Sequence, residues 1–156
     1  DEYVAKNVKI STRVSYEGMV KHQIIPYLGK IKLNELKKAD IENMYEKDLS
    51  VLKELFDKVN NNILSICLDI GHANCYSNQS LEEIIKLLGN RIGHLHLSNN
   101  DGKKDSHCGF NNGNIDVINT LNLIDKYCDN PSMTIEVTDF NEAIESIEFI
   151  MERNKK

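Results

Sequence analysis

The sequence predicts an α/β protein preceded by a small all-α segment. From residue 50 onward, short apolar runs alternate with segments of helical spacing, in the order helix, strand, helix, strand, loop, helix, strand, helix. Such alternation is typical of a parallel sheet with right-handed crossovers. Before residue 50, the apolar residues recur mainly at helical spacing, and no clear strand is visible. We therefore expect two parts, residues 1–49 and residues 50–156.

The first part is predicted to be helical, with no clear strand. Residues 11–25 carry an imperfect apolar stripe, which ends at Pro26 and Gly29. Asp40 has the position of an N-cap, because apolar residues follow it at helical spacing as far as Leu49. A second helix is therefore expected after Asp40.

Three strands are predicted in the second part. The first of them, residues 63–68, is an apolar run that is too short for a helix and is bounded by turn residues. Ser80 and Glu83 predict a capping box at the start of a helix that ends at Gly89. The predicted strands are residues 63–68, 92–97 and 133–137, and the predicted helices are about residues 52–59, 81–88, 116–128 and 141–152.

The charge of the chain is distributed unevenly. The net charge is −5, of which residues 1–50 carry +1 and residues 51–156 carry −6. A negative surface disfavours binding to nucleic acid. Four of the five histidines lie between residues 72 and 107, and composition alone does not explain that clustering.

Membrane insertion and export are not predicted. No apolar run approaches the roughly 20 residues of a membrane helix, and no basic and then apolar signal peptide opens the chain. We therefore expect a cytoplasmic protein with no membrane partner. The chain begins at Asp1 without a Met, which we interpret as the start of a fragment.

The four cysteines do not form a C-x-x-C pair, which argues against a zinc ribbon. Cys67 and Cys128 lie in apolar stretches, and we interpret them as small, reduced core residues.

A residue that can bind a metal ion closes each of the three predicted strands: Asp69, His96 and Glu136. Because the carboxyl ends of parallel strands meet on one face, we expect these side chains to converge there. Two carboxylates and an imidazole suit a divalent ion such as Mn²⁺, Co²⁺, Zn²⁺ or Mg²⁺. Further donors for a second metal or for substrate lie in the adjoining loops: His72, Asp105 and His107.

The order of these motifs resembles the second half of the xylose isomerase-like TIM barrel family. The motifs are Asp69-x-x-His72, His96-Leu97-Ser98, Asp105-x-His107, Gly113-x-Ile115-Asp116 and Glu136 at a strand end. That family contains sugar-phosphate isomerases and epimerases and the endonuclease IV group of apurinic endonucleases (AP endonuclease family 2). The resemblance implies a partial TIM barrel of about three βα units.

The same resemblance implies a function. It suggests a metal-dependent isomerase or epimerase acting on a sugar or sugar phosphate, with Asp69, His96 and Glu136 as metal ligands. Glu136 would also be the catalytic residue that moves a proton at a sugar carbon. The family's enzymes have a further Glu ligand in the first half of the barrel, and we expect no counterpart of it here.

The sequence departs from the family pattern at several places. Asn99 stands where an acidic residue is usual, and Asn111 replaces the first Gly of a Gly-x-Gly. A full barrel needs about 250 residues, whereas residues 50–156 number 107. We therefore expect a partial or hybrid chain that obtains its fourth ligand elsewhere, for instance from a second copy in a homo-oligomer.

Residues 11–41 resemble a different family. The segment Ile24-Ile25-Pro26-Tyr27-Leu28-Gly29 and its helical flanks are similar to the SAM-like core-binding domain of phage integrases, the tyrosine recombinases. That resemblance implies DNA binding by residues 1–49 without catalysis. The basic residues available for phosphate contacts are Lys9, Arg13, Lys21 and Lys30.

Three functions therefore stay open from the sequence. The first is a sugar isomerase or epimerase, which would make the chain an enzyme by family. The second is a DNA-binding module that needs no metal. The third is endonuclease IV-like repair of apurinic sites, because His72, Asp105 and His107 resemble that branch's third zinc site. The simplest alternative is that Asp69, His96 and Glu136 are ordinary polar residues at strand ends, and that His72 and His107 are surface histidines in loops.

Overall fold

Four parallel strands form one sheet, in the spatial order β1-β2-β3-β4 that they have along the chain. The computed structural model describes residues 39–59 and 64–153. Each strand pairs only with its neighbours in sequence, as expected for successive right-handed crossover units. The strands are β1 (Ala39–Glu42), β2 (Leu64–Asp69), β3 (Ile92–Leu97) and β4 (Ser132–Ile135).

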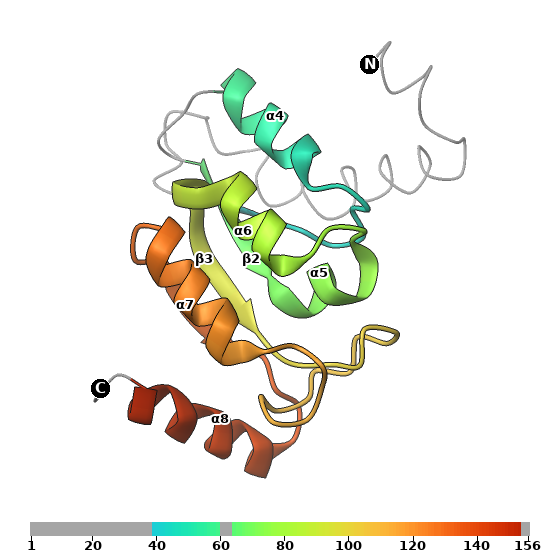
Figure 1. The fold of residues 1–156 in the computed structure, drawn as a ribbon, viewed down its shortest axis with the longest axis vertical. Helices are drawn as coiled ribbons and strands as arrows, with labels where there is room; N and C mark the ends of the chain where they lie inside the picture. The colour runs from blue at the N-terminus through green and yellow to red at the C-terminus, as the bar shows by residue number, and fades with distance from the viewer. Residues whose placement is uncertain (1–38, 60–63, 154–156) are drawn as a thin grey trace, which may run out of the picture. The chain divides into compact units, whose positions relative to one another are not determined.

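Helices connect the strands and cover one side of the sheet. Figure 1 shows α6 and α7 lying across β2 and β3, with α5 below the carboxyl end of β2. The helices are α4 (Ser50–Val59), α5 (Ile70–Tyr76), α6 (Leu81–Leu88), α7 (Val117–Tyr127) and α8 (Phe140–Arg153), with a short 3₁₀ turn, η3 (Gly89–Arg91), after α6.

The core lies between the helices and one face of the sheet. Alternate residues of a strand point to opposite faces, so Ile66 and Leu68 of β2 face the helices and are fully buried. Ile84 and Ile85 of α6 pack into the same cluster. The other face of β2 and β3 is left for the polar residues between these apolar ones, among them the predicted metal ligands.

The local sequence signals for α6 and α7 are confirmed. Ser80 and Glu83 form the predicted capping box, and Gly89 ends α6 with a φ of +50°, which suits glycine. Asp116 caps α7 by accepting a hydrogen bond from the Asn119 amide at 2.9 Å. The prediction of an α/β fold with a parallel sheet is therefore confirmed for the described residues.

The helix predicted after Asp40 is wrong. Residues 39–42 form β1, which pairs in parallel with residues 64–67 of β2, and no helix follows before Ser50. Met44 and Tyr45 were expected on an apolar helical stripe, but both are exposed. The hydrogen-bonded ladder with β2 outweighs the weak helical spacing of this short segment. The sheet thus has one strand more than the three predicted.

Some predictions fall outside the described residues. The helix of residues 11–25 is one, and the four basic residues proposed for DNA contact are others. Within residues 39–59 and 64–153, no helix is long and apolar enough to cross a membrane.

The position of α6 in the core can be tested with matched isoleucines. Ile85→Ala removes a fully buried side chain and should lower the free energy of unfolding by about 2–5 kcal/mol. Ile118→Ala on α7 removes a side chain that is 54% exposed and should change it by less than about 0.5 kcal/mol. Urea unfolding followed by circular dichroism measures both. Equal losses would contradict this packing.

Candidate metal centre

The three predicted strand-end residues converge. Asp69 ends β2, His96 lies in β3 and Glu136 follows β4, and one ligand atom of each lies within 4.8 Å of those of the other two. The Nδ1 atom of His96 is 3.3 Å from Glu136 Oε1 and 3.8 Å from Asp69 Oδ2. The parallel strands therefore bring the predicted set together at their carboxyl ends.

A fourth donor, Glu42, was missed by the sequence analysis. It ends β1, and its Oε1 atom lies 3.2 Å from His96 Nδ1 and 3.4 Å from His72 Nδ1. We expected no counterpart in this chain of the family's fourth ligand, a glutamate. The position of Glu42 beside the other donors contradicts that expectation. The missed signal is the alternation of apolar and polar residues in Ala39-Asp40-Ile41-Glu42, which is typical of a strand.

A second donor group adjoins the first. Asp105 Oδ2 lies 3.1 Å from His72 Nε2 and 3.2 Å from His107 Nε2. His107 has a φ of +48°, a left-handed conformation that is uncommon outside glycine. The Nδ1 atom of its ring is 2.9 Å from the Glu136 carbonyl, which leaves Nε2 facing Asp105. The backbone here is bent in a way that aims the imidazole at the carboxylate.

Asp69 carries the clearest sign that the first group fits a cation. Its side chain is 1% exposed, and Oδ1 accepts a hydrogen bond from the His72 amide at 2.8 Å. Oδ2 is buried without a hydrogen-bond partner. Burial raises the pKa of Asp69, the His72 amide acts against that rise, and the charges of Glu42 and Asp105 add to it. A buried carboxylate oxygen without a donor is unfavourable, and a bound cation would remove the deficit.

The second group shows the same deficit. Asp105 Oδ1 is also buried without a hydrogen-bond partner. Burial by itself lowers the pKa of His107, but the bond to the Glu136 carbonyl and the charges of Asp105, Asp69 and Glu136 outweigh it and raise that pKa. Both groups therefore hold negative charge that the described residues do not fully compensate.

Asn43 joins the ends of β1 and β2. Its Nδ2 donates to the Asp69 carbonyl at 3.0 Å, and its Oδ1 accepts from the Asp69 amide at 2.8 Å. The Asn43 carbonyl also lies 3.0 Å from His72 Nδ1. This buried amide fixes Asp69 and His72 relative to the strand that carries Glu42.

Asn99 organises the loop that presents Asp105 and His107. Its Nδ2 donates to the carbonyls of Phe110, at 2.8 Å, and Ile115, at 3.1 Å, while its Oδ1 accepts from the Ile115 amide at 3.0 Å. An aspartate could not make the two donations. The departure from the family pattern at this position therefore has a structural reason.

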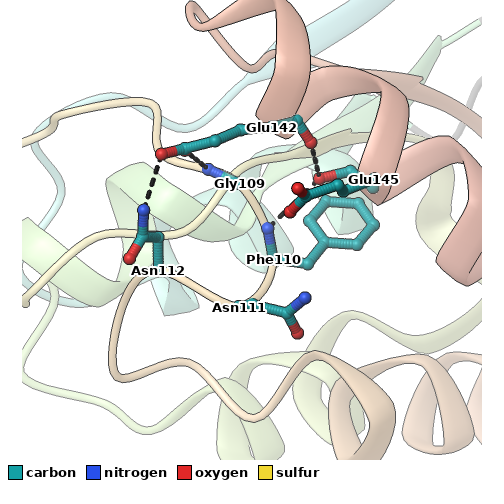
Figure 2. Close-up of a pocket in the computed structure, with 7 residues that line it drawn as sticks. Gly109, Phe110, Asn111, Asn112, Glu142 and Glu145 are labelled. Carbon is teal, nitrogen blue, oxygen red and sulfur yellow. Dashed lines mark hydrogen bonds between the residues drawn. The ribbon is translucent and has the colours of Figure 1, made fainter.

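Glu142 of α8 bonds to the same loop at Gly109 and Asn112, as Figure 2 shows. Its carboxylate accepts from the Gly109 amide at 2.5 Å and from Asn112 Nδ2 at 2.6 Å. Ser146, one turn further on, accepts from the Phe110 amide at 3.2 Å. Glu142 therefore links α8 to this loop. The cavity between loop and helix, about 140 Å³, is smaller than the roughly 300–1,000 Å³ of typical ligand pockets.

The role of Asn99 can be tested by a minimal change. Asn99→Asp replaces the donating amide with a carboxylate that faces two carbonyls, so we expect the free energy of unfolding to fall by about 1–3 kcal/mol. Asn111→Asp, in the exposed part of the same loop, should have little effect. Thermal unfolding of the metal-free proteins measures both. An Asn99→Asp protein as stable as the wild type would contradict the proposed hydrogen bonds.

Comparison with known proteins agrees with this fold. Residues 22–153 match the xylose isomerase-like TIM barrel family. Two curated relatives come from Methanocaldococcus jannaschii. The uncharacterized protein MJ1311 is 30% identical over 65% of this chain and 35% of its own length, and MJ1614 is 32% identical over 51% and 31%. The chain thus spans about a third of the length of these relatives.

Two solved structures are similar to the chain. A D-tagatose 3-epimerase-like protein has a TM-score of 0.64 and 29% identity, over 76% of this chain and 47% of its own. The TTHB071 protein from Thermus thermophilus, soaked with ZnCl₂, has a TM-score of 0.56 and 24% identity, over 72% and 42%, and shows the fold alone. The recombinase-type resemblance of residues 11–41 has no support among these matches and stays a prediction. The family match, the parallel sheet and the partial-barrel topology agree, and the chain belongs to the xylose isomerase-like TIM barrel family.

Proposed function

We propose that the chain contains the metal-binding half of a divalent-metal-dependent sugar or sugar-phosphate isomerase or epimerase. The observation that carries the proposal is the convergence of Glu42, Asp69, His96 and Glu136 from four successive parallel strands. Likeness to the D-tagatose 3-epimerase-like structure supports the sugar as substrate class.

These four residues are the ones that would hold the ion. Three carboxylates and one imidazole suit Mn²⁺, Co²⁺ or Mg²⁺, and Zn²⁺ also accepts such ligands. Bound there, the ion would supply positive charge to offset the negative charge that develops on a sugar oxygen as a neighbouring carbon loses its proton. Glu42 comes from this chain, so a second copy is not needed to complete the set.

Glu42 and Glu136 are placed to transfer the proton. They approach His96 Nδ1 from two different strands, at 3.2 Å and 3.3 Å, and each side chain is 33% exposed. Moving a proton between two carbons, or between two faces of one carbon, needs an acid and a base near the substrate. We assign Glu136 as one catalytic residue and Glu42 as the other. His72, Asp105 and His107 would contact the substrate or hold a second ion.

A second candidate function is cleavage of DNA at apurinic sites. It is favoured by the second donor group, where His72, Asp105 and His107 lie within 4.8 Å of one another. The net charge of −6 on residues 51–156 is unfavourable for a DNA-binding surface. Incision of an abasic oligonucleotide would favour this function over the first.

Two further partners remain proposals. DNA binding through residues 1–49 depends on basic residues outside the described part of the chain. Self-association is supported by four exposed apolar side chains that follow one another along α8 at helical spacing: Phe140, Ile144, Ile147 and Met151.

Metal binding should stabilise the fold. A ligand at a hundredfold its Kd adds about 2.7 kcal/mol, or roughly 5–10 °C in Tm for a domain of this size. We expect that rise with Mn²⁺, and its reversal by a chelator. Because protons compete for the raised-pKa groups Asp69 and His107, the rise should shrink as the pH falls. A Tm that Mn²⁺ does not change would contradict the site.

Asp69→Asn tests two properties of the site: how much the buried carboxylate destabilises the metal-free fold, and whether it binds the ion. The raised pKa means that the folded, metal-free chain holds the Asp69 proton more tightly than the unfolded chain does. Stability is therefore lost as the pH rises through the folded-state pKa. The variant keeps an oxygen that can accept the hydrogen bond from the His72 amide. At neutral pH its Tm should be a few degrees above that of the metal-free wild type, and Mn²⁺ should not change it. The exposed-site control, Asp129→Asn, should respond to Mn²⁺ like the wild type.

Proton transfer can be assayed without knowing the sugar. The Mn²⁺-loaded chain, incubated in D₂O with ketoses and their phosphates, should exchange a carbon-bound proton that NMR detects. Glu136→Gln should slow the exchange by about 10²-fold or more, whereas Glu148→Gln, on the exposed face of α8, should not. Equal exchange by both variants would remove Glu136 from the mechanism.

A further inference from the structure

A third donor group lies one step further back on the same face of the sheet. The Sγ atom of Cys67 in β2 and ring nitrogens of His94 and His96 in β3 lie within 4.8 Å of one another. Cys67 precedes Asp69 by two residues, and His94 precedes His96 by two, so each pair shares a face. The sheet register also pairs Cys67 with His94 and Asp69 with His96. The donors therefore form two adjacent rows that meet at His96.

The two rows differ in chemistry. The row at the strand ends is rich in carboxylates, whereas the row behind it combines one sulfur with two imidazoles. Sulfur and imidazole donors select thiophilic ions over Mg²⁺ or Mn²⁺. No disulfide occupies Cys67, which is a free thiol with 4% of its surface exposed. The partly exposed imidazoles give an ion access to it.

His94 can offer a lone pair without losing its support. Its Nδ1 lies 2.7 Å from the Ser132 hydroxyl, and its Nε2 lies 3.0 Å from the Thr134 hydroxyl. Both ring nitrogens of His94 are therefore within hydrogen-bond distance of a hydroxyl on β4. In the neutral ring, one nitrogen donates and the other accepts. An ion would take the accepting nitrogen, and the donating one would stay bonded to its hydroxyl.

We propose that Cys67, His94 and His96 form a second metal site, selective for thiophilic divalent ions such as Zn²⁺ and Cd²⁺, that competes with the carboxylate site for His96. A neutral imidazole has one lone pair, so His96 serves one ion at a time. When the sulfur binds the ion, the thiol proton passes to solvent. Thiolate and two imidazoles leave a fourth position for water, in the tetrahedral geometry that Zn²⁺ prefers.

The proposal has a functional consequence. A thiophilic ion held by Cys67, His94 and His96 takes His96 away from the carboxylate site. The ion therefore weakens Mn²⁺ binding without contacting Glu42, Asp69 or Glu136. The inference rests on the proposed function only for the inhibition, and the sulfur ligation itself is independent of it.

Cd²⁺ titration of the metal-free full chain tests the ligation. We expect ultraviolet thiolate-to-cadmium absorption that saturates near one equivalent. Cys67→Ser should abolish it, and His94→Gln should weaken Cd²⁺ binding at least tenfold. Cys128→Ser is the matched control. Burial raises the pKa of both thiols, to about 11 for Cys128 and to about 12 for Cys67. Among the described residues, however, Cys67 belongs to a group of possible metal ligands and Cys128 does not. Absorption that persists in Cys67→Ser, or its absence in the wild type, would overturn the proposal.

The competition is tested with Mn²⁺, whose free form is counted by electron paramagnetic resonance. One equivalent of Cd²⁺ should release Mn²⁺ from the wild type. Cys67→Ser should bind Mn²⁺ with a Kd within twofold of the wild type, but at least tenfold more Cd²⁺ should be needed to release it. Thiolate absorption that develops while Mn²⁺ stays bound would overturn the sharing of His96. Circular dichroism first confirms that each variant is folded, and Cys67→Ala replaces Cys67→Ser if the hydroxyl is not tolerated. A chain that gives the Cys67 signal but never binds Mn²⁺ would refute the proposed function and leave the thiophilic site standing.

Discussion

The pairing of β1 with β2 is the constraint on which the candidate site depends. The buried amide of Asn43 bonds to both main-chain groups of Asp69, which locks the ends of the two strands together. That lock sets Glu42 beside His96 and His72. It also leaves the Asp69 carboxylate buried among other acids, with one oxygen lacking a donor. Without this link between β1 and β2, Glu42 would not be held beside the three other strand-end residues, Asp69, His96 and Glu136.

Much of the fold can be predicted from the sequence because, from residue 50 onward, short segments that contain apolar residues alternate with segments of helical spacing. The predicted strand at residues 63–68 is observed at Leu64–Asp69, the one at 92–97 is observed at Ile92–Leu97, and the one at 133–137 is observed at Ser132–Ile135. Asp69, His96 and Glu136 follow from the rule that parallel strands present their carboxyl ends on one face. β1 escapes this reasoning because it is four residues long, and its Ile41 is only partly buried against the core. The spacing of Ile41, Met44 and Tyr45 fits a helix as well as a strand. Glu42 is therefore not recognised as a strand-end residue from the sequence.

The loop between β3 and α7 shows a different limit. Its shape depends on Asn99 and on Glu142, which bonds to Gly109 and Asn112 across 30 or more residues of sequence. Local patterns do not reveal such distant side-chain to backbone bonds, so the sequence shows Asn99 only as a departure from the family pattern and gives Glu142 no role. The positive φ of His107 is equally invisible, although it directs the ring at Asp105.

The sequential order of the strands has a consequence for biosynthesis. Among the described residues, each strand pairs with the strand or strands next to it in the sequence. The ribosome therefore releases the donors in the order Glu42, Asp69, His96 and Glu136, and the sheet can grow at one edge as they emerge. A nascent chain that has passed Asp69 but not Glu136 has the buried acid without its full set of partners. Tight capture of a metal ion would then mark the moment at which the last strand has joined the sheet.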